Sequence, residues 1–160
     1  MLEAIPKTWF SWDFDIVDPG GQPVANLDMS AWREKATFAV GDTTYRIHRE
    51  RLMSGAFLLE GEGAIVARAV KPSAFRHSFV VHQDGREYTL SRRSAFRREY
   101  VLRQDAREVG SVAPEKWFSR RAAVNLPDDL PLAVRVFIVV LVLLLWKRDS
   151  NAAAAAGGAS

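Results

Sequence analysis

The chain has no cysteine among its 160 residues. Disulfide bonds, a cysteine nucleophile, a zinc site with thiolate ligands and palmitoylation are therefore excluded. Histidine is also scarce. His77 and His82 are five positions apart, which places them on opposite faces of a strand, and His48 is distant from both. We therefore expect no metal site and no cofactor.

The chain also lacks recognisable catalytic patterns. Gly61-Glu62-Gly63 does not match a phosphate-binding loop, and Ser54-Gly55 lacks the surroundings of a nucleophile elbow. Asp13 and Asp15 share one face of a predicted strand, but such a pair is far more often a solvated surface than an acid–base pair. We expect that the protein is not an enzyme, and we predict no catalytic residues.

The first ten residues, MLEAIPKTWF, contain neither the basic segment nor the apolar run of a secretory signal. We therefore expect a cytoplasmic protein. If it binds lipid, it would lie at the periphery of a membrane.

Short alternating segments separated by turns fill most of the first 125 residues. Trp12, Phe14 and Ile16 alternate with acidic residues, and Asp84-Gly85 is a strong signal for a two-residue hairpin. Strands at intervals of about 8–12 residues predict an all-β barrel or sandwich. We interpret the aromatic residues at alternating positions, Trp117 among them, as barrel core rather than as platforms for nucleic-acid bases. The expected strands cover residues 12–16, 24–32, 36–40, 43–51, 57–60, 64–70, 78–82, 87–91, 99–103, 108–112 and 117–124.

Residues 130–146, LPLAVRVFIVVLVLLLW, are apolar on every side of a helix except at Arg135. Such a helix needs apolar surroundings, either a bilayer or the interior of its own protein. Its length of about 25 Å is short for a hydrocarbon core of about 30 Å but still within the tolerated range, so length leaves both surroundings open. We expect a helix over 130–147, one domain over 8–149, and a flexible low-complexity tail over 150–160.

Arg135 is the one charge inside this apolar segment. Because it lies near the start of the helix, we expect its guanidinium to reach solvent or a carboxylate at the rim of the fold, with the aliphatic stem buried. Asp128 and Asp129 are the candidate partners by proximity.

The segment 122–148, a strand followed by NLPDDLPL and the apolar helix, resembles the tubby C-terminal-like superfamily. This superfamily includes tubby domains, phospholipid scramblases and LURP-one-related proteins, and FDIVDPGGQPV and FVVHQDGREYTL are similar to it in strand rhythm. The resemblance covers about residues 8–149 and implies a mostly β fold. That fold is a closed antiparallel barrel of about twelve strands around a buried hydrophobic C-terminal α-helix. On this resemblance we favour residues 130–147 as the central helix of the barrel over a membrane span. The compact form is closest to LURP-one-related proteins, because the cysteine cluster and acidic calcium-binding segment of scramblases have no counterpart here.

Charge is unevenly distributed along the chain. Residues 1–63 carry a net charge of −4 and residues 64–121 a net charge of +7. A one-sided basic field attracts phosphate groups, although arginine-rich strands that merely solvate a barrel are the alternative. Because tubby domains bind phosphoinositides, the resemblance implies anionic membrane lipids as partners, and no nucleic acid is expected. The candidate binding residues for anionic head groups are the arginine doublets Arg92, Arg93, Arg97, Arg98, Arg120 and Arg121.

Three functions remain open at this stage. The first is a non-enzymatic, membrane-peripheral barrel that binds anionic phospholipid or phosphate groups. The second is a tail-anchored, single-pass membrane protein in which residues 130–146 span the bilayer. The third is a small-molecule binder or enzyme whose site forms only when distant segments meet in the fold.

Overall fold

The computed structural model describes residues 1–9, 11–30, 35–51, 55–72, 77–117 and 119–158. Twelve strands and one helix lie in these ranges. They are β1 (Leu2–Pro6), β2 (Phe14–Val17), β3 (Pro23–Ser30), β4 (Lys35–Val40), β5 (Thr43–Arg49), β6 (Phe57–Gly61), β7 (Ala64–Val70), β8 (Ser78–Gln83), β9 (Arg86–Arg92), β10 (Tyr100–Gln104), β11 (Arg107–Pro114), β12 (Ala122–Asn125) and α1 (Leu132–Gly157).

The twelve strands form one closed antiparallel barrel in which each strand pairs with the next along the chain. The barrel closes where β1 pairs with β12, with Leu2 opposite Val124 and Ala4 opposite Ala122. Closure leaves no unpaired strand edge, so every strand contributes its hydrogen bonds to two neighbours. The predicted fold class, a closed barrel of about twelve strands with a C-terminal helix, is confirmed.

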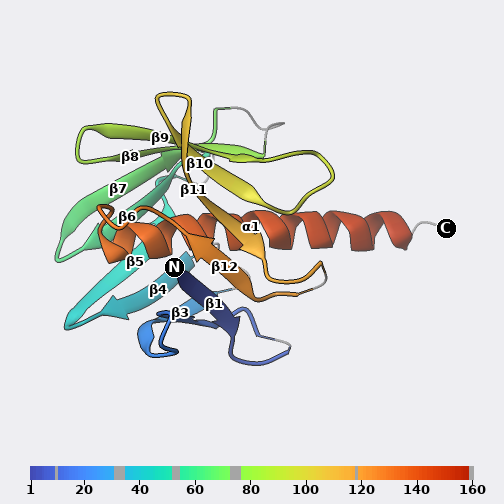
Figure 1. Ribbon diagram of the computed structural model, residues 1–160, viewed down its shortest axis with the longest axis horizontal. Helices are drawn as coiled ribbons and strands as arrows, with labels where there is room; N and C mark the ends of the chain where they lie inside the picture. Colours follow the sequence, from blue (N-terminus) through green and yellow to red (C-terminus); the bar gives the residue numbers. More distant parts are fainter. Residues whose placement is uncertain (10, 31–34, 52–54, 73–76, 118, 159–160) are drawn as a thin grey trace.

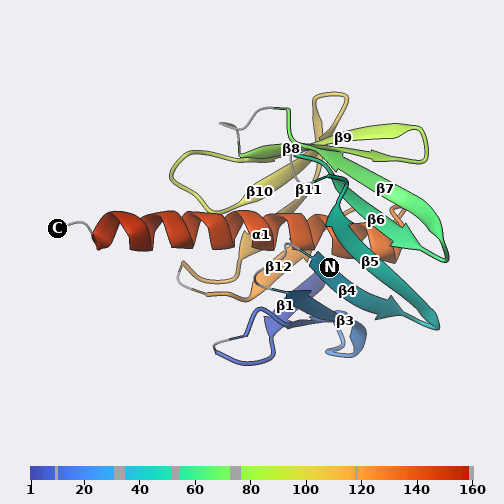
Figure 2. The same cartoon turned by 180° about the vertical axis from the view of Figure 1, so that it is seen from behind.

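The helix α1 runs through the lumen of the barrel (Figure 1). It begins after β12 at one end, and its C-terminal part protrudes from the other end, as Figure 2 also shows from behind. All side chains from Val136 to Trp146 are buried. Thirteen buried residues of this one helix therefore form the centre of the core. Within the described ranges, no helix combines the length and the hydropathy needed to cross a membrane.

Inward-facing strand residues leave room for this helix. Burial alternates along the strands; for example, Ala36 and Phe38 of β4 are buried while Lys35 and Thr37 are exposed. Many inward positions hold small side chains, and small side chains let the strands approach the helix closely enough for dense packing. The buried alanines of the strands are Ala4, Ala25, Ala36, Ala67, Ala69 and Ala122.

The connections at the end where α1 begins are tight turns. Asp84 and Gly85 have φ angles of 48° and 72°, which are the left-handed values that a two-residue hairpin turn requires. The hairpin predicted at Asp84-Gly85 is therefore confirmed. Similar turns join β4 to β5, β6 to β7, and β10 to β11.

The structure differs from the sequence expectations at both ends of the domain. The barrel begins at β1, before the expected boundary at residue 8, and the barrel does not close without this strand. The helix continues through residues 150–157, which were expected to belong to a flexible tail. The expected strand over 117–124 is also shorter, because β12 begins at Ala122.

Arg135 lies near the start of α1, where the helix meets the barrel end. Its Nη1 atom is 3.1 Å from Oδ1 of Asp128, and the Arg135 side chain is only 17% exposed while that of Asp128 is 90% exposed. The guanidinium thus reaches a carboxylate at the rim with its stem buried, which confirms the expectation. Asp129, the other candidate, instead pairs with Arg86 at 2.9 Å.

Phe137 is fully buried in α1, so truncating it tests the helix as core. We expect Phe137→Ala to lower the free energy of unfolding by about 3–5 kcal/mol, because it leaves a cavity inside the barrel. Urea denaturation followed by circular dichroism measures this change. Phe96→Ala is the matched control: Phe96 is exposed, so its truncation should change the stability by less than about 0.5 kcal/mol. Equal effects of the two substitutions would contradict a buried helix.

Candidate functional site

The two ends of the barrel differ in charge. We call the end where α1 begins the turn end; its connections contain seven acidic side chains and no basic one. At the opposite end, the described connections and residues 147–149 of the emerging helix contain eleven basic and five acidic side chains. The charge of the connections therefore separates along the barrel axis, which the division of the sequence into halves did not reveal. Two of the acidic residues at the turn end, Asp128 and Asp129, pair with Arg135 and Arg86. The acidic residues of the turn end are Asp18, Asp42, Glu62, Asp84, Asp105, Asp128 and Asp129.

Three exposed aromatic residues lie in neighbouring connections at the end where the helix emerges. Trp9 is 82% exposed, Phe96 is 88% exposed and Trp117 is 63% exposed. They lie in three different connections, which follow β1, β9 and β11. In Figure 1 these connections extend in the same direction as the protruding part of α1. We call this surface the exit rim, defined by the described residues of 7–13, 93–99 and 115–121.

The interpretation of Trp117 as barrel core was wrong. Trp117 lies outside any strand, in the connection between β11 and β12, and its side chain is exposed. The alternation of aromatic residues continues only to the end of each strand, so it does not apply to a residue in a connection.

The fold brings all six candidate arginines to the end where the helix emerges. Arg92 ends β9, and the other five lie in the connections that follow β9 and β11. The doublets are therefore not spread over opposite faces of strands.

Three of these arginines are committed to contacts within the protein. Arg92 pairs with Asp149 of the helix at 2.5 Å, and Arg93 contacts Glu99 at 2.8 Å and Glu108 at 2.5 Å. Arg120 donates hydrogen bonds to the carbonyl oxygens of Trp9 and Ser11. These contacts hold neighbouring connections together, so these three guanidinium groups are only partly available to a ligand. The guanidinium of Arg120 also lies 4.8 Å from the ring centre of Trp12.

The remaining three arginines differ in availability. Arg98 is half-buried, with its guanidinium 4.8 Å from the ring centre of Trp146, and burial lowers its pKa from the usual value. Arg121 lies 3.7 Å from Glu115, which is a loose and exposed pair. Arg97 is exposed, and among the described residues its side chain makes no ion pair.

A cleft of about 390 Å³ lies between the connections that follow β9 and β11. Arg97, Arg98 and Lys116 line it together with Trp117, and two carboxylates complete the polar lining. Lys116 is exposed and, within the described part of the chain, its side chain makes no ion pair either. Arg97 and Lys116 thus present two available cations beside an exposed indole, an arrangement suited to an anionic group at an apolar boundary.

The helix is fixed where it leaves the barrel. The indole Nε1–H of Trp146 donates to the carbonyl oxygen of Arg98 at 2.8 Å. One turn later, Asp149 pairs with Arg92 and lies 3.5 Å from Nδ1 of His77. These contacts fix the direction in which the rest of α1 leaves the exit rim.

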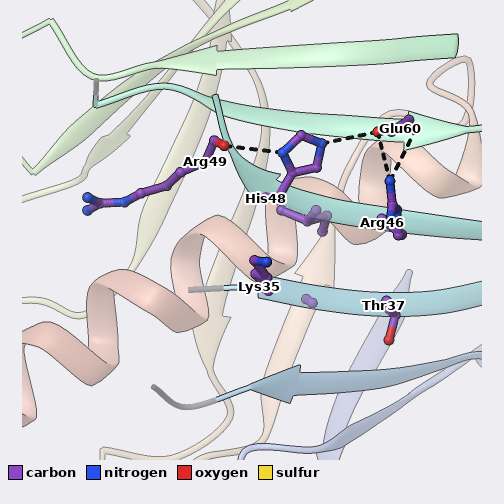
Figure 3. Close-up of a pocket in the computed structure, with 8 residues that line it drawn as sticks. Lys35, Thr37, Arg46, His48, Arg49 and Glu60 are labelled. Carbon is purple, nitrogen blue, oxygen red and sulfur yellow. Dashed lines mark hydrogen bonds and ion pairs between the residues drawn. The ribbon is translucent and has the colours of Figure 1, made fainter. Parts of the chain in front are cut away.

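A second concave surface, which we call the wall groove, lies on the outer wall of the barrel, on β4, β5 and β6. It has a volume of about 280 Å³, and Lys35, Arg46, His48 and Glu60 are among its lining residues. Figure 3 shows the ring of His48 between the carbonyl of Arg49 and the carboxylate of Glu60. Arg46 lies on the other side of Glu60, with its Nη2 atom 3.4 Å from both carboxylate oxygens.

The polar groups of this wall groove largely satisfy one another. Nδ1 of His48 is 3.2 Å from the carbonyl oxygen of Arg49, and Nε2 is 3.1 Å from Oε2 of Glu60. The imidazolium form donates to both acceptors, whereas the neutral ring donates to only one. Because Glu60 already occupies the guanidinium of Arg46, an anion entering the groove would have to displace this carboxylate. The groove is therefore less open to anions than the cleft at the exit rim.

Sequence reasoning missed Trp9, Phe96 and Lys116. A signal was available, because the connections that follow β1, β9 and β11 are long and combine aromatic with basic residues. The tight turns at the other end contain acidic residues, in most cases beside glycine. Only the strand order reveals that the first kind of connection gathers at one end.

Metal binding has no support among the residues that the structure describes. They contain no group of three or more histidine and carboxylate side chains that could hold a metal ion. Comparison with protein-family models, curated proteins and solved structures finds no match to this chain.

Glu60 provides a test of the wall groove through pH. Its hydrogen bond with His48, and then its contacts with Arg46, lower the pKa of Glu60 below its ordinary value of 4.5. The ionised carboxylate therefore stabilises the fold above that ordinary value, and the stabilisation is lost as the pH falls through the lowered pKa. We expect Glu60→Gln to reduce the melting temperature at neutral pH and to have little effect in strong acid.

Thermal melts across this pH range compare Glu60→Gln with Glu3→Gln, which removes the same charge from an exposed position on β1. The control should show a smaller effect at neutral pH. A destabilisation by Glu60→Gln that is equally large in strong acid would mean that the ionised contacts are not its cause.

Proposed function

We propose that this protein is a non-enzymatic, membrane-peripheral barrel that docks on anionic lipid membranes through the exit rim. One observation carries the proposal. Exposed aromatic residues and available cations lie in neighbouring connections at the end where the helix emerges, while the described connections at the turn end contain only acidic charge.

The aromatic residues support an apolar boundary as the partner. Large apolar side chains with 63–88% exposure are costly in water. Three of them in neighbouring connections are typical of a surface that binds a partner. Tryptophan is favoured at membrane–water interfaces because its ring is apolar while its N–H still finds a hydrogen-bond acceptor. Trp9 and Trp117 would therefore lie at the level of the head groups. Phe96, whose ring has no polar group, would lie closer to the acyl chains.

Electrostatics supports one orientation. Each basic residue close to an anionic membrane surface contributes about 1 kcal/mol, and the attraction decays within about 10 Å at moderate salt. The exit rim is attracted, whereas the acidic turn end is repelled. The barrel would therefore dock with its axis close to the membrane normal and with its turn end facing away.

The arginines divide into two groups under this proposal. Arg97 and Lys116 would contact the phosphate of a head group in the cleft beside Trp117, while Arg121 pairs with the lining residue Glu115. Arg92, Arg93 and Arg120 would instead hold the rim in shape through the carboxylates and carbonyl groups that they contact.

We also propose that the chain is a compact member of the tubby C-terminal-like superfamily. The support is architectural: a closed twelve-stranded barrel whose C-terminal helix fills the lumen. A location at the periphery of a membrane follows from the docking proposal, and the cytoplasmic side is proposed because its leaflet carries the anionic lipids. The helix segment 130–146 lies inside the barrel, which disfavours its use as a membrane anchor.

Vesicle co-sedimentation tests the docking proposal. We expect the protein to sediment with phosphatidylcholine vesicles that contain phosphatidylserine, and to remain in the supernatant with phosphatidylcholine alone. High salt should release it, because the attraction is screened. Trp117→Ala, and the double substitution of Arg97 and Lys116 by alanine, should each weaken the association by about tenfold or more.

Two control variants match these changes on other parts of the barrel. Ile65→Ala removes an exposed apolar side chain from β7, and Arg107→Ala removes an exposed arginine close to the turn end. Neither should reduce the association. Equal partitioning of the protein with and without anionic lipid, at both salt concentrations, would refute docking through this surface.

A further inference from the structure

The helix α1 continues well beyond the barrel. Its side chains are buried as far as Trp146, half-buried from Lys147 to Asp149, and exposed from Ser150 to the end of the helix at Gly157. Both views show this part projecting past the loops of the exit rim (Figures 1 and 2). We call residues 150–157 the helical extension; it contains Ser150, Asn151, five alanines and Gly157.

We propose that the helical extension enters the lipid when the exit rim docks, so that one helix serves both as the barrel core and as a membrane wedge. The proposal rests on the docking function proposed above and adds a specific insertion depth to it. The occupant of the extension's exposed surface is thus lipid rather than a second protein chain.

The composition of the extension permits insertion. It has no charged side chain, and its Ser150 hydroxyl donates to the carbonyl oxygen of Trp146 at 3.0 Å. Backbone groups in the body of a helix bond to one another without water, as a chain in lipid requires, and the N–H of Gly158 bonds to the carbonyl oxygen of Ala154. The last carbonyl groups of the helix have no partner within it and would need contacts with water or head groups. Because the extension continues a helix that the barrel already holds, it needs no separate nucleation.

The length of the extension sets how deep it can reach. At about 1.5 Å per residue, it rises about 12 Å beyond Asp149. Half of a hydrocarbon core of about 30 Å is about 15 Å, and the head groups take up part of the extension as well. The extension therefore reaches the boundary between head groups and acyl chains and stops short of the bilayer midplane.

The rim fixes the direction of the wedge. Trp146 is held by Arg98, and Asp149 is held by Arg92 and His77, so the extension leaves the barrel in a defined direction. The connections that contain Trp9, Phe96 and Trp117 extend in the same direction in Figure 1. A membrane that contacts all three aromatic residues therefore meets the extension end-on.

The absence of cysteine allows a direct depth measurement, because one introduced cysteine is the only labelling site. We would place an environment-sensitive fluorophore at Ala154→Cys in the extension, at Ala95→Cys in the exit rim, and at Asp42→Cys in the turn end. All three positions are exposed. The vesicles contain phosphatidylcholine and phosphatidylserine, with bromine at different depths of the acyl chains as a quencher.

On vesicle binding, we expect blue shifts at Ala154 and Ala95 and none at Asp42. Brominated acyl chains should quench the label at Ala154 more strongly than the label at Ala95. A shift at Ala95 without one at Ala154 would overturn the wedge and leave the docking function intact. Absence of any shift, together with no sedimentation, would refute both. A concentration-dependent shift at Ala154 without vesicles would identify a second copy of the chain as the occupant and overturn the wedge.

Charge substitutions at residue 154 give an independent test. Their expected effects differ according to whether the extension enters lipid or stays in water. If residue 154 enters lipid, Ala154→Lys and Ala154→Asp should both weaken vesicle binding several-fold, because either charge is costly there. If the extension stays in water beside the head groups, lysine should strengthen binding and aspartate should weaken it, which would overturn the wedge. Ala39→Lys and Ala39→Asp, at an exposed position on β4, control for the change in net charge.

Discussion

The structure depends on filling the lumen of a twelve-stranded barrel. A barrel with this many strands is too wide for its own inward side chains to close, and an empty lumen would expose apolar surface and lose packing contacts. The helix α1 supplies the missing volume, and it is buried from the barrel entrance to Trp146. This explains why the helix has no polar side over that length, and why the inward faces of the strands hold so many alanines.

The strand order converts this architecture into a molecule with two different ends. Because each strand pairs with its sequence neighbour, successive connections alternate between the ends. One set consists of tight turns with acidic residues, and the other consists of longer segments with aromatic and basic residues. The helix enters at the acidic end and leaves at the basic one. The protein thus has one acidic and one basic end. The proposed membrane surface follows from this difference between the ends rather than from any single motif.

Much of the fold could be predicted from the sequence. The rhythm of short strands predicted a barrel or sandwich, and the resemblance carried by that rhythm and by the apolar segment 130–146 implied a closed barrel with a central helix. Arg135 finds its expected kind of partner at Asp128. The first strand was missed because β1 is short and follows no turn, so its pairing with β12 depends on closure of the whole barrel. The helix extends farther than expected because the buried part removes the nucleation cost of the alanine-rich part.

The candidate surface could be predicted only in part. The arginine doublets were recognised, but which guanidinium groups are engaged within the protein depends on contacts between distant segments, such as Arg92 with Asp149 and Arg120 with the β1–β2 connection. The exposure of Trp117 was missed because alternation predicts burial only within a strand. Trp32, at the end of the strand expected over 24–32, and Phe75 lie outside the described residues.

Amide hydrogen exchange along α1 tests most directly whether one helix is both the core of the barrel and a projection beyond it. If the account is correct, amides of residues 136–146 exchange only through global unfolding, as slowly as the slowest strand amides. Amides of residues 150–157 should exchange through local opening in the absence of membranes. Exchange in residues 136–146 that is faster than in β10 and β11 would contradict the account, because the barrel would then persist while its helix opened.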